Sequence, residues 1–338
     1  MSLISKIKNK FLNSSDSYNH YKNESNRLSK DIDKELKDLR REFDRYKKTN
    51  DSIQKSYNRL FNTIFLDYDL KPKGALKYTQ ILCLELLDFY INVCKKYDLE
   101  FWLDYGNLLG ARRHNGFIPW DDDLDVGMMR EDCQKFNEVF EKEVKLHNLE
   151  NIIDISREFL TSETSVRAFT QITIRNNYDY LYAGLDVFPC DYVIDPPEDI
   201  EEVYKSAKVE YYKNTFHKMD KEDVIKDFYE RVNCSYDKQK YYLPSIEGPF
   251  GNGRYKFNLF KTDKLFPLKE IEFEGRFYPC PNDVDDYLTG IYGEHFMKIP
   301  RLVHYHRRLD TLRKDKDLED KFNYYLKTLK EANDNFKM

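Results

Sequence analysis

The stretch of sequence that decides the fold is residues 105–126, YGNLLGARRHNGFIPWDDDLDV. Its end has the alternating pattern of a β-strand, with Leu124 and Val126 on one face and Asp123 and Asp125 on the other. Two carboxylates on one strand face repel each other unless a cation joins them, and oxygen-only ligands suit Mg²⁺ or Mn²⁺. The pattern therefore predicts a metal site on this strand. The alternative, a solvated acidic turn, fits poorly with four aspartates held between Pro-Trp and an apolar strand.

A third carboxylate is expected from a neighbouring strand. In GLDVFP, residues 184–189, Asp186 stands alone between apolar residues, as in a strand that contributes one acid to a site. The predicted metal ligands are thus Asp123, Asp125 and Asp186. Asp121 and Asp122 lie nearer the loop, and we expect at least one of them to brace the turn rather than to bind the metal.

The residues just upstream complement these acids. Gly106 and Gly110 at a strand-to-helix turn allow close backbone approach, and a helix N-terminus offers free N–H groups to phosphate. Arg112 and Arg113 have the charge to neutralise a diphosphate, and His114 is a candidate for binding it or for proton transfer.

Other candidate site residues have a second reading. Trp102, Tyr105 and Trp120 flank the motif and are of the type that cages a quaternary ammonium, although burial in the core is the commoner fate of such side chains. Arg175, at the end of a strand pattern over 171–175, has the length to reach a phosphate, but a surface charge is an equal interpretation.

The rest of the chain predicts a mixed α/β or α+β domain. Helices and strands of suitable period alternate at the following ranges: helix Leu76–Tyr97, strand Leu99–Asp104, helix Gly106–Arg113, strand Asp123–Met128, helix Glu131–Leu146, strands Ala168–Arg175 and Gly184–Val193, and a helix-rich stretch Glu198–Tyr229. The expected organisation is an N-terminal helical region (1–70), a catalytic domain (71–300) and a C-terminal helical tail (301–338).

The N-terminal region has a coiled-coil pattern. From Ile32 to Ile64 apolar residues recur in alternating steps of four and three, with Asn50 at an a position. A buried Asn at a favours a parallel dimer in fixed register, and Glu35 would face Arg40 of a partner helix. The sequence thus predicts a homodimer through a parallel coiled coil. An amphipathic helix folded back on its own domain is the alternative.

Composition excludes several classes of protein. The formal net charge is −5, from 55 basic and 60 acidic residues, so no basic field exists to hold a nucleic acid. The 15% of aromatic residues argues against a disordered chain. Six scattered cysteines without zinc spacing fit reduced thiols.

The expected location is the cytoplasm. No apolar run approaches a membrane span, and the N-terminus lacks the apolar core of a signal peptide. The first twelve residues, MSLISKIKNKFL, place apolar side chains on one helical face among lysines, which would suit peripheral contact with the inner face of the cell membrane. A frayed terminus is the alternative.

The glycine turn followed by strand acids matches the logic of the polymerase-β-like nucleotidyltransferase fold. Residues 105–126 also resemble the hallmark of the LicD family, which includes the fukutin-like proteins: G-T-L-L-G-x-x-R-H-x-G-F-I-P-W-D-D-D-x-D-h. The similarity extends from about Lys77 to Pro300. Asn107 departs from it, because the family usually has Thr there, although an amide can still donate to a phosphate.

This resemblance implies a metal-dependent phosphotransferase. LicD-like enzymes move phosphocholine from CDP-choline, or ribitol phosphate from CDP-ribitol, to a glycan hydroxyl in the biosynthesis of surface polymers, and CMP leaves. The expected partners are a CDP-linked donor and a glycan or lipid-linked glycan acceptor. Asp123 and Asp125 would bind Mg²⁺, and Asp186 would complete the site or act as general base.

Two alternatives stay open. A nucleotidyltransferase would use the same acids to move NMP from an NTP and release pyrophosphate. A coiled-coil scaffold with a degenerate transferase domain would need no metal, but the intact pair of Asp123 and Asp125 argues against it.

Overall fold

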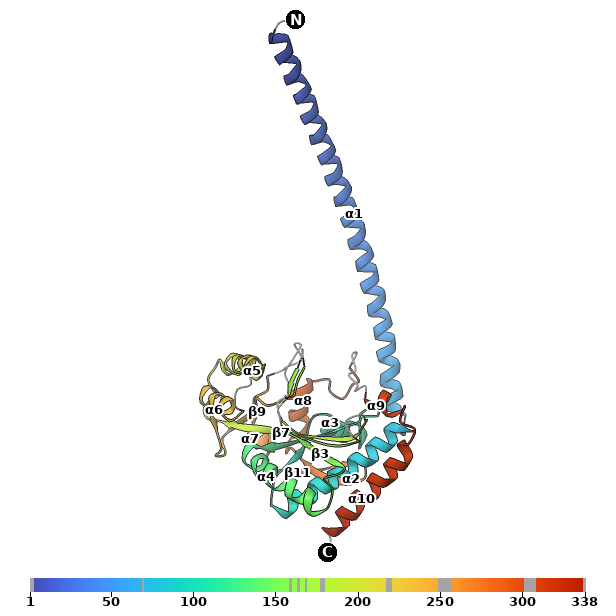
Figure 1. Ribbon diagram of the computed structural model, residues 1–338, viewed down its shortest axis with the longest axis vertical. Helices are drawn as coiled ribbons and strands as arrows, with labels where there is room; N and C mark the ends of the chain where they lie inside the picture. The colour runs from blue at the N-terminus through green and yellow to red at the C-terminus, as the bar shows by residue number, and fades with distance from the viewer. Residues whose placement is uncertain are drawn as a thin grey trace. The chain divides into compact units, whose positions relative to one another are not determined.

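The chain divides into two compact units, residues 1–63 and 64–338 (Figure 1). The structure is a computed structural model, and it describes residues 3–68, 70–157, 160–162, 165–167, 169–176, 180–216, 221–248, 257–300 and 308–336.

The first unit is a single helix, part of α1 (Leu3–Asp67). The predicted seam residues from Ile32 to Leu60 are exposed, among them Leu36, Leu39 and Phe43, whereas Ile64 is half-buried. The helix itself was thus predicted correctly, whereas the coiled-coil dimer stays a prediction. The side chains of residues 1–4 and 6–17 lie outside the described part of the chain, and so does the predicted membrane-contact face.

A mixed sheet of eight strands forms the centre of the second unit. Its main path is β1-β2-β7-β6-β3, and only the pairing of β2 with β7 is parallel along it. The second half of β7 also pairs with β8 and β9, and β10 pairs with β9. The strands are β1 (Trp102–Leu103), β2 (Leu124–Met129), β3 (Ile153–Ser156), β6 (Thr170–Asn176), β7 (Tyr180–Val193), β8 (Cys234–Ser235), β9 (Tyr241–Pro244) and β10 (Phe260–Lys261). The predicted α/β (α+β) class is confirmed.

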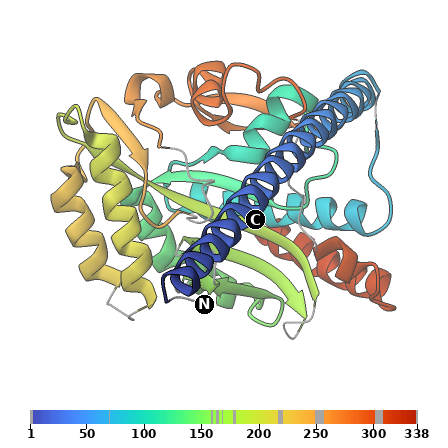
Figure 2. The same cartoon turned by 90° about the horizontal axis from the view of Figure 1, so that it is seen from above.

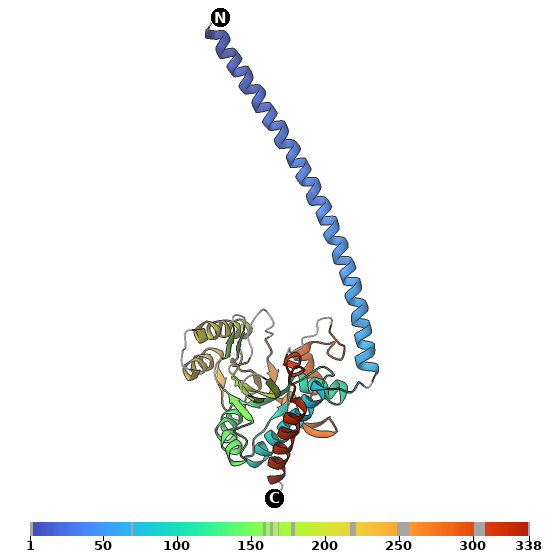
Figure 3. The ribbon, with the colours of Figure 1, turned by 45° about the vertical axis from the view of Figure 1, so that its right-hand side comes forward.

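Helices from both ends of this unit pack against the sheet. Helix α10 (Leu318–Asn335) lies beside α2 (Ala75–Lys96), as Figures 1 and 3 show, and Asn333 Nδ2 donates to the carbonyl of Glu85 at 3.0 Å. The other helices of the main core are α3 (Tyr105–His114), α4 (Arg130–Leu146), α7 (Thr262–Leu265), α8 (Val284–Tyr292) and α9 (Arg308–Leu312). The C-terminal helix is therefore packed on the same unit as the sheet.

A second hydrophobic cluster forms at the far end of β7. Helices α5 (Ile200–Phe216) and α6 (Lys221–Val232) lie side by side (Figure 2) and bury Tyr204 and Phe228 against Val193 and Leu243. This helix pair corresponds to the helix-rich stretch expected over 198–229.

Two hairpins complete the described chain, β4 (Leu160–Ser162) with β5 (Ser165–Arg167), and β11 (Lys269–Phe273) with β12 (Arg276–Cys280). At the tip of the second, Glu274 N–H donates to the carbonyl of Asn115 and Glu274 Oε1 accepts from Phe117 N–H, both at 3.0 Å. The hairpin thereby braces the segment that leads into the acidic loop.

None of the described helices is long and apolar enough to cross a membrane. None of the six cysteines forms a disulfide in the described chain, and five of them are buried.

Candidate active site

Asp125 and Asp186 stand opposite each other on the two parallel strands of the sheet. In the pairing of β2 with β7, Asp125 is the register partner of Asp186, and their neighbours Leu124, Val126 and Leu185 are fully buried. Because side chains alternate along a strand, this register places both carboxylates on one face of the sheet and the apolar residues on the other.

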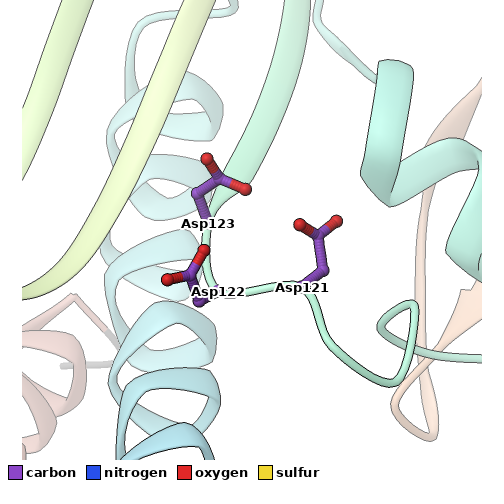
Figure 4. Close-up of side chains that lie close together, drawn as sticks. All are labelled: Asp121, Asp122 and Asp123. Atoms are coloured by element: carbon purple, nitrogen blue, oxygen red, sulfur yellow. The ribbon is translucent and has the colours of Figure 1, made fainter. Parts of the chain in front are cut away.

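The loop before β2 adds three carboxylates. The side chains of Asp121, Asp122 and Asp123 each offer an oxygen within 4.8 Å of the other two (Figure 4). Asp122 is 1% exposed, and Gln80 Nε2 on α2 donates to the carbonyl of Asp121 at 2.9 Å. Among the described residues, these three side chains lie close enough together to hold one metal ion. The predicted set of ligands is different, because it combines Asp123 with Asp125 and Asp186 from the strands.

The carboxylates of this group repel one another. The pKa of Asp125 is raised well above its ordinary value, first by burial and then by the negative charges of Asp123, Asp186 and Asp121. A bound cation would relieve this repulsion. The donor set consists of carboxylate oxygens alone, so the residues present fit Mg²⁺ or Mn²⁺.

Arg308 on α9 reaches this group from the C-terminal part of the chain. Its Nε lies 2.9 Å from Asp122 Oδ2, and its Nη2 donates to Asp123 Oδ2 at 2.6 Å. Burial lowers the pKa of the guanidinium, but the carboxylates of Asp123 and Asp122 raise it above its ordinary value. Sequence reasoning missed Arg308, because an arginine far from the motif carries no pattern of its own.

The glycine turn holds an acid in the structure. Gly106 N–H at the start of α3 donates to Asp125 Oδ2 at 3.2 Å, and a Cβ at Gly106 would lie 2.7 Å from Asp121 Oδ2. Asn107 Oδ1 accepts a hydrogen bond from the backbone N–H of Asp125. Asn107 is buried, and its Nδ2 has no partner among the described residues. The helix N-terminus predicted to bind phosphate therefore adjoins the acidic cluster.

Gly110 serves a close packing contact. A Cβ at this position would lie 2.4 Å from the carbonyl oxygen of Gly116 and 3.0 Å from the N atom of Ile118. The absence of a side chain thus lets α3 approach the loop that carries the acids.

The basic residues at the end of α3 have protein partners. Arg112 forms a two-pronged ion pair with Asp285, with distances of 2.8 and 3.2 Å. Arg113 donates through Nη1 to the carbonyl of Phe296 at 3.0 Å and through Nε to His114 Nε2 at 2.9 Å. Burial and the charge of Arg113 lower the pKa of His114 to about 4. This geometry keeps His114 neutral near pH 7 and occupies one ring nitrogen.

Two aromatic candidates pack against protein. Trp120 makes an edge-to-face contact with Phe65, with ring centroids 4.8 Å apart, and Trp102 is fully buried, with its Nε1 3.3 Å from the hydroxyl of Tyr287. Trp102 therefore faces no ligand. For Trp102 the structure shows the burial that was the alternative reading, whereas the half-buried Trp120 stays a predicted site residue.

The polar residues of β6 lie at different distances from the acids. Gln171, the register partner of Asp186, donates from Nε2 to Asp186 Oδ1 at 3.0 Å. Arg175 is four residues along the strand, roughly 13 Å by strand rise, and pairs with Asp154 on β3. Gln171 was missed as a site residue, although the buried Ile172 and Ile174 that follow it mark its alternating strand.

A buried thiol lies behind the acidic loop. Cys83 Sγ on α2 is 3.9 Å from the carbonyl oxygens of both Asp122 and Gly184. Burial raises the pKa of this thiol to about 12. Cys83 therefore packs as a neutral side chain between the loop and β7.

Comparisons with known proteins show the family of the chain. Residues 98–283, more than half of the chain, match the family model described as LicD/FKTN/FKRP, nucleotidyltransferase domain. The chain is 28% identical to the lipopolysaccharide cholinephosphotransferase LicD of Haemophilus influenzae over 252 residues, which cover 68% of this chain and 93% of that protein.

Shorter similarities include the following two proteins. An uncharacterized protein of Rickettsia typhi is 50% identical over 74 residues, which is 21% of this chain and 22% of the relative. The human ribitol 5-phosphate transferase FKRP is 38% identical over 60 residues, 17% of this chain and 12% of the relative.

Proposed function

The chain belongs to the LicD family of nucleotidyltransferase-fold domains, and from this premise we propose that it is a metal-dependent transferase of substituted phosphate groups. It moves phosphocholine or a polyol phosphate from a CDP-activated donor to a hydroxyl of a cell-surface glycan or its precursor, and it releases CMP. The observation that carries the proposal is the register pair of Asp125 and Asp186 beside the acidic loop 121–123. Relatives named as cholinephosphotransferase and ribitol-phosphate transferase support the choice of transferred group.

In this proposal Asp123 and Asp125 bind the metal, and Asp186 either completes the metal site or acts as the general base. Bound Mg²⁺ or Mn²⁺ supplies charge neutralisation at the donor diphosphate. The chain's own residues prepare the site: Gly106 N–H and Asn107 Oδ1 fix the carboxylate and the backbone of Asp125, and Gln171 orients Asp186. Positioning of this kind is the main contribution that a protein makes to phosphoryl transfer.

The transfer itself forms one P–O bond and breaks another. The acceptor oxygen bonds to the phosphorus that carries the choline or polyol, the bond from that phosphorus to the oxygen of CMP breaks, and the hydroxyl proton passes to a base. Asp186 is either the third metal ligand or that base. Asp186→Asn separates the two roles, because loss of Mn²⁺ binding identifies a ligand, and loss of turnover with Mn²⁺ binding retained identifies the base.

The proposed setting is the cytoplasmic side of the membrane, where lipid-linked glycan precursors would meet a CDP-linked donor. We propose that α1 pairs with a second copy through its seam as a parallel coiled coil, because the apolar seam residues from Ile32 to Leu60 are exposed in the described chain. The N-terminal dozen residues would add peripheral contact with anionic lipid.

The decisive experiment measures CMP release from a panel of CDP-linked donors, with Mg²⁺ and with EDTA. Metal-dependent release from one donor supports the proposal and identifies the head group. Pyrophosphate release from an NTP, with no CMP from any donor, would instead identify a nucleotidyltransferase. A folded protein that turns over neither class, even with glycan acceptors present, would favour the scaffold alternative.

A further inference from the structure

We propose that Arg308 is the internal counter-ion of the acidic site. When a metal ion binds, it replaces Arg308 as the partner of Asp123, while the ion pair between Arg308 and Asp122 remains. The inference rests on the metal site of the proposed function. It adds a residue that lies outside the part of the chain matched by the family model, which ends at residue 283.

The guanidinium bridges two consecutive carboxylates. Nε contacts Asp122 Oδ2 at 2.9 Å, and Nη2 on the same edge donates to Asp123 Oδ2 at 2.6 Å. An arginine edge usually grips both oxygens of one carboxylate. Here the edge is shared between two acids, so it holds the loop in one conformation and offsets part of the repulsion between them.

The charge balance requires such a cation. Asp121, Asp122, Asp123, Asp125 and Asp186 bring five carboxyl groups into one region, and Arg308 is a cation that the described part of the chain places in contact with two of them. A guanidinium cannot be deprotonated in proteins, so its charge is permanent. Without metal, Arg308 thus offsets part of the negative charge of this loop.

The two acids differ in access. The side chain of Asp122 is 2% exposed, whereas that of Asp123 is 16% exposed and that of Arg308 is 15% exposed. An ion that arrives from solvent therefore meets Asp123 before it meets Asp122. The exchange therefore concerns the bond from Nη2 to Asp123, and the pair with Asp122 remains as the anchor.

The sheet also provides room for the arginine. A Cβ at Gly184 of β7 would lie 3.2 Å from Arg308 Nη1, so the guanidinium lies over a position without a side chain, two residues before Asp186. A dication bound by Asp123, Asp125 and Asp186 would lie close to this guanidinium. Because like charges at such range repel strongly in a partly buried site, the two cations compete for Asp123.

The test uses full-length protein and measures Mn²⁺ binding by electron paramagnetic resonance of the free ion, together with Tm in EDTA and in Mn²⁺. We expect Arg308→Gln to bind Mn²⁺ at least about tenfold more tightly than the wild type, which corresponds to about 1.4 kcal/mol, and to have a lower Tm in EDTA. Arg308→Lys keeps the charge and should bind Mn²⁺ close to the wild-type affinity. Arg313→Gln removes an exposed arginine that pairs with Asp310 in the same segment, and it serves as the matched control.

A merely structural role of Arg308 would weaken metal binding on substitution, so the direction of the change is diagnostic. Equal or weaker Mn²⁺ binding by folded Arg308→Gln overturns the inference while leaving the proposed function intact. If the wild type binds no Mn²⁺ at all, the proposed metal site fails and this inference with it.

A wild-type measurement covers the case in which Arg308→Gln does not fold. In a crystal structure with saturating Mn²⁺, we expect Nη2 to have left Asp123, which then binds the ion, while Nε remains at Asp122. An unchanged bond between Nη2 and Asp123 beside a bound ion would refute the exchange.

Discussion

The Oδ1 of Asn107 accepts a hydrogen bond from the backbone N–H of Asp125. A side chain at the start of α3 thus fixes the strand residue that carries a predicted metal ligand. The amide is buried, and its Nδ2 has no partner in the described chain, so it is a donor beside the acidic cluster. LicD-family sequences usually have Thr at this position. A threonine hydroxyl can also accept a hydrogen bond, but it reaches less far than the amide of Asn107.

Replacement of Asn107 tests this contact. Asn107→Ala should lower the free energy of unfolding by about 1–3 kcal/mol, because it leaves a partly buried N–H without an acceptor. Asn107→Thr should cost less, since a hydroxyl can still accept. Urea denaturation measures both, with the exposed Asn151→Ala as control. Equal losses for Ala and Thr would show that the acceptor is not what matters.

Asp125→Asn should separate stability from metal binding. Burial and three neighbouring carboxylates disfavour the charge of Asp125, so the neutral amide should raise the Tm in EDTA. Mn²⁺ affinity should fall by more than the roughly 10–100-fold typical of residues that only orient ligands. Calorimetry with and without Mn²⁺ checks both, and the exposed Asp285→Asn is the control. Unchanged Mn²⁺ affinity would remove Asp125 from the metal site.

The contact between Gly116 and Glu274 predicts a coupled pair. A Cβ at Gly116 would lie 2.2 Å from Glu274 Oε1, which accepts from Phe117 N–H. Gly116→Ala should therefore cost about 1–2 kcal/mol, by displacing the carboxylate and leaving that N–H unpaired. In a Glu274→Ala background the same change should cost far less. A double-mutant cycle by urea denaturation measures the difference, and additive effects would contradict the proposed clash.

His114 should contribute a pH dependence to stability. Its pKa is about 4 in the folded protein, against 6.5 as the ordinary value. The unfolded chain therefore binds the proton more readily, and stability present above pH 6.5 is lost as the pH falls towards 4. The upper limit is about 3 kcal/mol, reduced by solvent screening of a half-buried group.

Urea denaturation at pH 7.5 and at pH 5 measures this term. His114→Gln should lose less stability than the wild type between these values, and the exposed His295→Gln should behave as the wild type. Parallel pH profiles for wild type and His114→Gln would exclude the assignment.

The seam of α1 predicts a dimer of the full chain. Leu36→Asp combined with Leu39→Asp should convert a dimer to a monomer in light scattering, because charges at a and d positions cannot be buried. Lys37 lies between these two leucines but off the seam, so the control variant Lys37→Asp should leave the mass of the dimer unchanged. A monomeric wild type would end the coiled-coil proposal.

The hydrophobic periodicity of the sequence predicted the secondary structure that depends on local residue order. The long helices and the strands that carry Asp125 and Asp186 were found because burial on one face imposes a period on the sequence. The predicted strand over 99–104 is only Trp102–Leu103 in the structure, and Asp104 after it is the N-cap of α3, whose side chain accepts from Tyr105 N–H at 2.7 Å. A cap and a strand end have the same appearance in a short apolar run.

Contacts between distant segments could not be predicted. Arg308 meets Asp123 across 185 residues, and Gln171 meets Asp186 only through the register of β6 on β7. The sequence also offered Arg112 and Arg175 as phosphate ligands, but it could not show that Asp285 and Asp154 compete for them. Charge identifies a candidate, and only the tertiary fold identifies its partner.

The position of Cys83 makes its thiol a built-in reporter of motions of the acidic loop. The thiol is sealed between the loop and β7, so an alkylating reagent reaches it only when the two separate. Peptide mapping by mass spectrometry would distinguish it from the half-buried Cys234, which should react first. The labelling rate of Cys83, followed as cations or nucleotides are added, would report how often the loop opens without any introduced probe.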